Sequence, residues 1–194
     1  KNRKDLNEYK LEFAVDEDVS FEEAFTGADV VLGLSKPGSF TKEHISLMNM
    51  KPIIFALANP TPEIFPDEIR EVRPNAIIGT GRSDFNNQVN NVIGFPFIFR
   101  GALDVHATHI NIPMKLAAVR AIADLAKKEI PEQLQALFDE KLEFGKEYVI
   151  PKPFDKRLLV EVSSAVAQAA FETGVARVES FDVEAYKKEL SSLL

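Results

Sequence analysis

Three short apolar runs, each followed by a polar loop, constrain the fold of this chain more than any other feature. They lie within Asp29–Ser35, Ile53–Leu57 and Ala76–Gly79, with helical patterns between them. Because apolarity in the first run is continuous rather than alternating, it predicts a strand that is covered on both faces, as in a parallel sheet. Strand–helix–strand alternation at this spacing is typical of βαβ crossovers. We therefore expect an α/β fold, in which a parallel sheet is flanked by helices.

Helix signals follow the same order along the chain. Ser20 and Glu23 form a capping-box pattern, Gly27 is a stop signal, and Thr41 can cap a helix that ends near Met48. The residues before Ser20 are charged and without a sustained period, which predicts a loop or arm over 1–18. The further predicted helices span Pro66–Val72, Phe95–Asp104, Asn111 to about Lys128, Pro131 to about Phe138, Leu158–Gly174 and Asp182 to the end. The Ala-rich helix Leu158–Gly174 is expected to pack on a face of the sheet.

Asparagines follow two of the predicted strands. Asn59 comes directly after the second strand, and Asn90 and Asn91 precede the Phe-rich helix that follows the third. Ligands of open α/β sheets bind beyond the carboxyl ends of the strands, and a carboxamide there can both donate and accept hydrogen bonds. Residue chemistry alone leaves alternatives open, since an Asn before a proline is a common turn residue and one Asn of the pair can cap a helix.

Other patterns carry less weight. Gly79-Thr80-Gly81 is not a dinucleotide fingerprint, because Asp84 stands where the third glycine belongs, and these glycines are expected to relieve backbone strain. His106 and His109 have a metal-pair spacing without an accompanying carboxylate motif, so surface histidines are the simpler interpretation. No nucleophile–base pair stands out. From the residues alone, the chain is interpreted as a nucleotide-type domain with a polar crevice and no catalytic centre.

Composition excludes several classes of protein. The 194 residues carry a net charge of −7, which argues against non-specific nucleic-acid binding. There is no cysteine, so disulfides and thiolate metal sites are excluded, which suits a cytoplasmic protein. No apolar run approaches the roughly 20 residues that a membrane helix needs. The first residues are too polar for a signal peptide and lack an initiator Met, so we expect the chain to begin within a longer protein.

Four longer stretches carry a family resemblance. They read ADVVLGLSKPG, FALANPTPEI, AIIGTGRSDFNNQVNNVIGFPFIFRGALDV and EYVIPKPFDKRLLVEVSSAVAQAA. This pattern resembles the bacterial malic enzymes, from about residue 5 to 178. Such enzymes oxidatively decarboxylate malate to pyruvate and CO2 with NAD or NADP and Mg²⁺ or Mn²⁺. The resemblance implies a Rossmann-like dinucleotide-binding domain over residues 1–178 that lacks its first βαβ unit, followed by a helical tail over 179–194.

The resemblance also assigns site residues. Asn59 and Asn91 match family asparagines that contact the substrate and the nicotinamide half of the cofactor. Asn90, Ser35 and Ser83 lie beside matched positions and are further candidates for cofactor contact. The family's catalytic lysine and tyrosine and its metal ligands have no counterpart here, so the chain alone is expected to be inactive, and no catalytic or metal-binding residue is assigned.

Two matters stay open from the sequence. The choice between NAD and NADP is not determined. The oligomeric state is not determined either, although the resemblance implies a homodimer or higher homo-oligomer, the usual state in the family. Phe95, Phe97 and Phe99 are expected in the core or at a subunit interface. The alternative to an enzyme is a non-catalytic nucleotide-binding or assembly module that keeps the fold and uses this Phe-rich surface.

Overall fold

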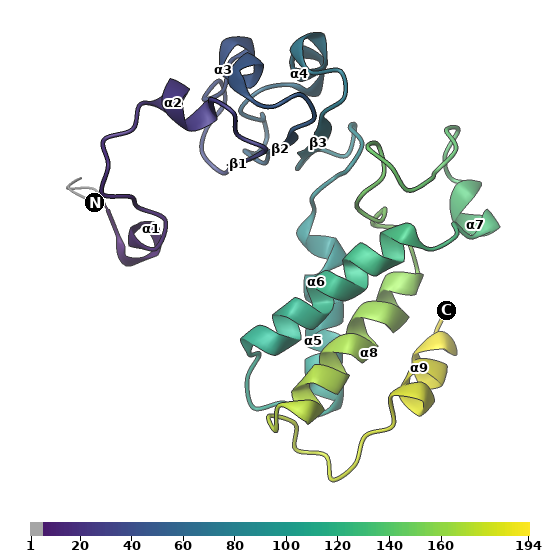
Figure 1. Ribbon diagram of the computed structural model, residues 1–194. Helices are drawn as coiled ribbons and strands as arrows, with labels where there is room; N and C mark the ends of the chain where they lie inside the picture. The colour runs from purple at the N-terminus through teal and green to yellow at the C-terminus, as the bar shows by residue number, and fades with distance from the viewer. Residues whose placement is uncertain (1–5) are drawn as a thin grey trace.

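The computed structural model describes residues 6–194. Its sheet contains the three predicted strands, all parallel and in the order β1-β2-β3 (Figure 1). The strands are β1 (Val30–Gly33), β2 (Ile53–Ala56) and β3 (Ile77–Thr80). The register pairs Leu32 with Phe55 and Phe55 with Gly79. The prediction of a parallel α/β sheet is therefore confirmed, and parallel pairing brings the carboxyl ends of all three strands to one edge.

Three helices cover one face of this sheet (Figure 1). They are α2 (Phe21–Phe25), α3 (Lys42–Leu47) and α4 (Pro66–Val72). The capping box predicted for Ser20 and Glu23 is present, and the Thr41 side chain caps α3. Side chains of the helices and of alternate strand positions form a common core of Phe25, Phe40, Ile45, Met48, Ile54, Ala56, Ile64, Ile69, Ala76 and Ile78.

The opposite face of the sheet is only partly covered within residues 6–194. Val30 is 52% exposed and Leu32 is 61% exposed, whereas Ile53 and Phe55 are partly buried. The prediction that the first strand is covered on both faces is therefore wrong for the part of the protein described here. Continuous apolarity reports what a strand can bury, and successive side chains point to opposite faces, so a single helical layer covers only half of them.

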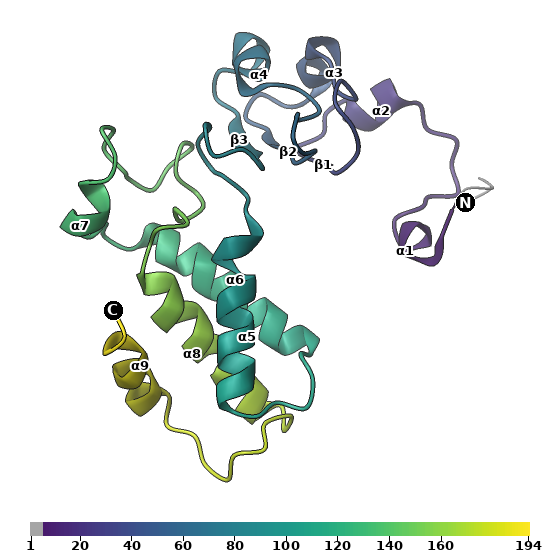
Figure 2. The ribbon, with the colours of Figure 1, turned by 180° about the vertical axis from the view of Figure 1, so that it is seen from behind.

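The second half of the chain is helical (Figure 2). A 3₁₀ turn, η1 (Asn91–Ile93), leads from the sheet into α5 (Phe95–Asp104), which is followed by α6 (Ile112–Lys127), α8 (Arg157–Glu172) and α9 (Val183–Ser191). Helix α8 packs against α5, α6 and α9. The prediction that this Ala-rich segment lies on the sheet is wrong. Its small side chains instead permit close helix–helix packing, and the Leu190 side chain of α9 is fully buried in the same core.

Two short helices differ from expectation. Helix α7 (Glu132–Gln135) ends earlier than predicted, and Pro131 is its N-cap rather than its first residue. Helix α1 (Glu8–Leu11) lies within the predicted arm, where the Asn7 side chain accepts a hydrogen bond from the amide of Lys10. Residues 1–5 of that arm lie outside the described residues. From residue 6 onward, no helix has the length and apolarity required to cross a membrane.

Candidate functional site

The candidate site is the edge of the sheet at which the strands end. Three loops leave this edge, over residues 34–41 after β1, 57–65 after β2 and 81–90 after β3. They carry four of the five residues predicted to contact ligands, Ser35, Asn59, Ser83 and Asn90, and the fifth, Asn91, begins η1 directly after the third loop. In parallel sheets flanked by helices this edge is the usual place for a small-molecule site.

A buried acidic residue joins the first two loops. The Glu63 side chain is 1% exposed, and its Oε1 accepts a hydrogen bond of 2.7 Å from the backbone N–H of Ser35. Its other oxygen accepts one of 3.0 Å from the backbone N–H of Ala58. Residue-type reasoning missed Glu63. No sequence signal marked it, because the burial that Glu63 shares with Pro62 and Ile64 becomes visible only in the structure.

An arginine joins the second and third loops. Arg82 binds both carboxylate oxygens of Asp84, each at 2.8 Å, and its Nη1 donates to the carbonyl oxygen of Pro60 at 3.3 Å. The hydrogen bond from Arg82 lowers the pKa of the Asp84 carboxyl below its usual range, so this group stays ionised at neutral pH. The Asn59–Pro60 peptide bond, next to this contact, is cis.

The third loop is attached to the connector that precedes α8. Asn87 is 3% exposed, and its Nδ2 donates to the carbonyls of Ile78 at 2.9 Å and Lys146 at 2.8 Å. Its Oδ1 accepts from the backbone N–H of Val149 at 2.7 Å. Asn87 also has a positive φ of 51°, a conformation that asparagine tolerates better than most residues. Its role is structural, and no local sequence signal distinguished it from the neighbouring asparagines.

The structure separates the three predicted asparagines by their partners. The Oδ1 of Asn90 accepts a hydrogen bond of 3.0 Å from the amide of Val92 and so caps η1. Asn59 and Asn91 are exposed, and neither side chain hydrogen-bonds to any residue in the described part of the chain. Of the pair, Asn90 is thus a helix cap, which was one of the alternatives left open, and the Asn91 side chain is free to bind a ligand.

The two serines also differ. The Ser35 hydroxyl hydrogen-bonds to the Ser39 hydroxyl at 3.1 Å, whereas Ser83 is exposed and makes no side-chain hydrogen bond to another residue of the 6–194 range. The nearby Gly79 and Gly81 do not relieve backbone strain, contrary to expectation, because neither has a positive φ. A Cβ at Gly79 would lie 2.9 Å from the Phe55 ring, so the position needs glycine for close packing.

The donor set fits a dinucleotide and does not fit a metal ion. Uncharged amides and hydroxyls can hydrogen-bond the ribose hydroxyls and the carboxamide of a nicotinamide cofactor. For a metal ion, by contrast, residues 6–194 hold no group of three or more His, Cys, Asp or Glu side chains that could ligate it. The ligand roles of Asn59, Asn91, Asn90, Ser35 and Ser83 stay predictions.

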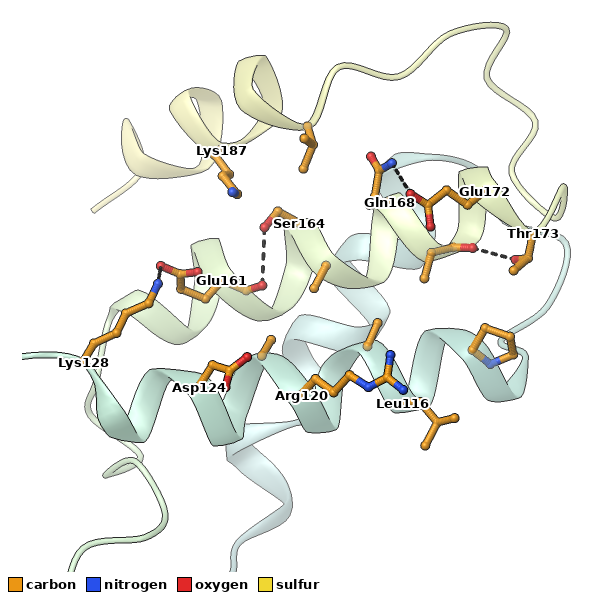
Figure 3. Close-up of a pocket in the computed structure, with 16 residues that line it drawn as sticks. Leu116, Arg120, Asp124, Lys128, Glu161, Ser164, Gln168, Glu172, Thr173 and Lys187 are labelled. Carbon is orange, nitrogen blue, oxygen red and sulfur yellow. Dashed lines mark hydrogen bonds and ion pairs between the residues drawn. The ribbon is translucent and has the colours of Figure 1, made fainter. Parts of the chain in front are cut away.

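A separate groove of about 750 Å³ lies between α6, α8 and α9 (Figure 3). Several of its polar side chains are paired with one another. Lys128 and Glu161 form an ion pair of 2.5 Å, and Gln168 donates to Glu172 at 2.6 Å. None of the predicted site residues lines this groove. It is a junction between helices, and it does not compete with the strand ends as the candidate site.

Comparison with known proteins identifies the family. Residues 1–140 match the family described as "Malic enzyme, NAD binding domain". The chain belongs to the malic enzymes. It is 56% identical over 191 residues to a probable NADP-dependent malic enzyme of Rickettsia prowazekii, covering 97% of this chain and 25% of that protein. It is 57% identical over 177 residues to an NADP-dependent malic enzyme of Halomonas elongata, covering 90% of this chain and 42% of that protein.

The malic enzyme fold is also matched by solved structures. The structure of Entamoeba histolytica malic enzyme superposes with a TM-score of 0.78 at 38% identity, over 89% of this chain and 33% of that one. The chain thus spans between a quarter and less than half of the length of these relatives. It corresponds to a partial, Rossmann-like NAD-binding portion, as the sequence resemblance implied.

Proposed function

We propose that the full-length protein is an NAD(P)-dependent malic enzyme that oxidatively decarboxylates malate to pyruvate and CO2. The observation that carries the proposal is membership of the malic enzyme family, supported by two exposed carboxamides, Asn59 in the loop after β2 and Asn91 at the start of η1. This chain would supply the later part of the cofactor-binding domain.

The role of this chain in the reaction is one of positioning. The oxidised dinucleotide, when bound, supplies the electron acceptor for the malate hydroxyl carbon. Asn59 and Asn91 orient the substrate and the nicotinamide half of the cofactor through hydrogen bonds, while Asn90, Ser35 and Ser83 make further cofactor contacts. Orientation of this kind lowers the entropic part of the barrier. Mg²⁺ or Mn²⁺ and the acid–base groups would be held by residues outside this chain.

The assignment of the two asparagines is tested by kinetics of the full-length protein. Asn59→Ala and Asn91→Ala should each lower kcat/KM for malate by about tenfold or more, which corresponds to about 1.4 kcal/mol of lost transition-state stabilisation. Asn75→Ala is the matched control, because Asn75 is an exposed asparagine that precedes β3 at the opposite edge of the sheet. Wild-type kinetics for both site variants would contradict the assignment. The 194-residue chain alone should produce no NAD(P)H from malate.

An assembly role is the second candidate. Phe95 and Phe99 lie one turn apart on α5, are 54% and 50% exposed, and have ring centroids 6.1 Å apart. Exposed aromatic pairs of this kind are frequent at protein interfaces. We propose that this surface contributes to a homodimer or higher homo-oligomer of a cytoplasmic protein. An assembly module without enzymatic function would associate and still show no malate-dependent turnover as a full-length protein.

A further inference from the structure

Glu63 occupies a position that packing alone does not explain. It is 1% exposed in a region whose other buried side chains, such as Phe40 and Ile64, are apolar. Burying a carboxylate is costly unless its oxygens are hydrogen-bonded, and an apolar side chain of similar volume would often stabilise such a site as well or better. The Glu63 carboxylate therefore has to be understood through the two backbone N–H groups that it binds.

Those two N–H groups continue the link between β1 and β2 beyond the end of the sheet. The last backbone hydrogen bond between these strands runs from the N–H of Leu57 to the carbonyl of Gly33, at 2.9 Å. Beyond it, the Glu63 carboxylate bridges Ser35 at 2.7 Å and Ala58 at 3.0 Å. A side chain thus takes over where the backbone pairing stops.

The surrounding backbone leaves room for this carboxylate. A Cβ at Gly33 would lie 2.6 Å from Cδ of Glu63, so any larger residue at that position would displace the acidic group. Ser35 and Asn59, which we expect to contact the cofactor, lie on the two loops that Glu63 connects, and Asn59 directly follows Ala58. The relative position of these two loops therefore depends on one carboxylate.

We propose that Glu63 is a positioning residue of the cofactor crevice. Its carboxylate holds the loops after β1 and β2 in the arrangement that lets Ser35 and Asn59 contact one dinucleotide. Glu63 itself does not touch the ligand. The cofactor part of this inference rests on the proposed function, whereas the link between the loops does not.

Amide hydrogen exchange without cofactor tests the link directly. In Glu63→Gln one acceptor oxygen becomes an NH2 group that faces an N–H donor, so the amide of Ser35 or Ala58 should exchange at least about tenfold faster. Glu71→Gln is the matched control, because Glu71 lies on α4, is exposed and, among residues 6–194, pairs with Lys42 alone, at 2.9 Å. Exchange rates at both amides that equal those of the control would overturn the proposal. If Glu63→Gln does not fold, Glu63→Asp, which keeps the charge but shortens the reach, is measured in the same way with the same expectation.

A double-mutant cycle in the full-length protein tests the consequence for the cofactor. The effect of Asn59→Ala on the Kd for NADP or NAD is measured by titration in the wild type and in Glu63→Gln. The fold-change in Kd should be at least about threefold smaller in Glu63→Gln, because the displaced loop has already lost part of the Asn59 contact. Additive effects would show a merely structural role and overturn the positioning role. If wild-type protein binds neither dinucleotide, the proposed function fails, while the exchange measurement still decides the link between the loops.

Discussion

The contact between α5 and α8 depends on the absence of a side chain at Gly101. A Cβ built at this position would lie 2.3 Å from the backbone carbonyl oxygen of Ser163, whereas ordinary contact begins at 3.4 Å. It would also lie 3.0 Å from Cβ of Val166 and 3.1 Å from the backbone nitrogen of Ala167. Two of these three atoms belong to the backbone of α8, so they cannot move aside by a change of rotamer. The helices would have to separate.

Two opposing effects determine the stability of Gly101→Ala. Alanine in a helix is favoured over glycine by about 1 kcal/mol, which would stabilise α5. Overpacking a well-filled contact costs about 1–3 kcal/mol, and contact with rigid backbone atoms places the cost at the upper end. We therefore expect a net loss of about 2 kcal/mol in the free energy of unfolding.

The assay is urea unfolding followed by circular dichroism, with the midpoint compared at unchanged slope. Gly145→Ala is the control, because the nearest atom to its added Cβ lies at 3.9 Å and its φ is not positive, so the change should be neutral or slightly stabilising. Val166→Ala combined with Gly101→Ala should restore none of the loss, because alanine keeps the Cβ of residue 166 that is contacted and the closest contact is to backbone. A midpoint for Gly101→Ala at or above that of the wild type would refute the reasoning, since helix propensity would then outweigh packing.

Two further predictions concern stability. Asn87→Ala removes three hydrogen bonds of a buried amide and places alanine at a positive φ, so it should lower the free energy of unfolding by about 2–4 kcal/mol. Asn87→Gly should cost about 1 kcal/mol less, because glycine adopts a positive φ without strain. Equal urea midpoints for the two variants would contradict this contribution of backbone conformation. Burial and the hydrogen bond to Asp104 raise the pKa of Tyr186 above its ordinary value of 10.0. The neutral phenol therefore stabilises the folded protein fully below pH 10, and the free energy of unfolding should fall as the pH rises above 10. Tyr186→Phe should make this fall with pH less steep, by up to about 1.4 kcal/mol per pH unit. Urea midpoints at several pH values between 9 and 12 would test this, and parallel curves for the two proteins would refute it.

Local signals predicted the elements well. A capping box depends on residues three apart, so the sequence alone was sufficient to predict Ser20 with Glu23, and likewise the cap Thr41. The partner of a helix is a different kind of property. The Ala-rich pattern of α8 records that something packs closely against it, and it contains no information on whether that partner is a sheet or another helix.

The loops show the same limit more sharply. Asn87, Asn90 and Asn91 are the same residue type within five positions, yet they have three different roles. Asn87 is buried and binds the connector before α8, Asn90 caps η1, and Asn91 is exposed. The cap was among the anticipated alternatives, because its partner is two residues away. The role of Asn87 was not anticipated, because its partners Lys146 and Val149 lie 59 and 62 residues further along the chain.

Glu63 illustrates why residues that organise a site are harder to find than residues that contact a ligand. An asparagine at a strand end attracts attention because exposed polar groups in loops bind ligands. Glu63 does the opposite, since its polar atoms are used up inside the protein, by Ser35 and Ala58. Only the burial of a carboxylate next to a strand end marks it, and burial depends on how β1 and β2 pair. Buried charged groups that bind backbone N–H at the carboxyl edge of a sheet should therefore be mutated before exposed ones when the residues of such a crevice are tested.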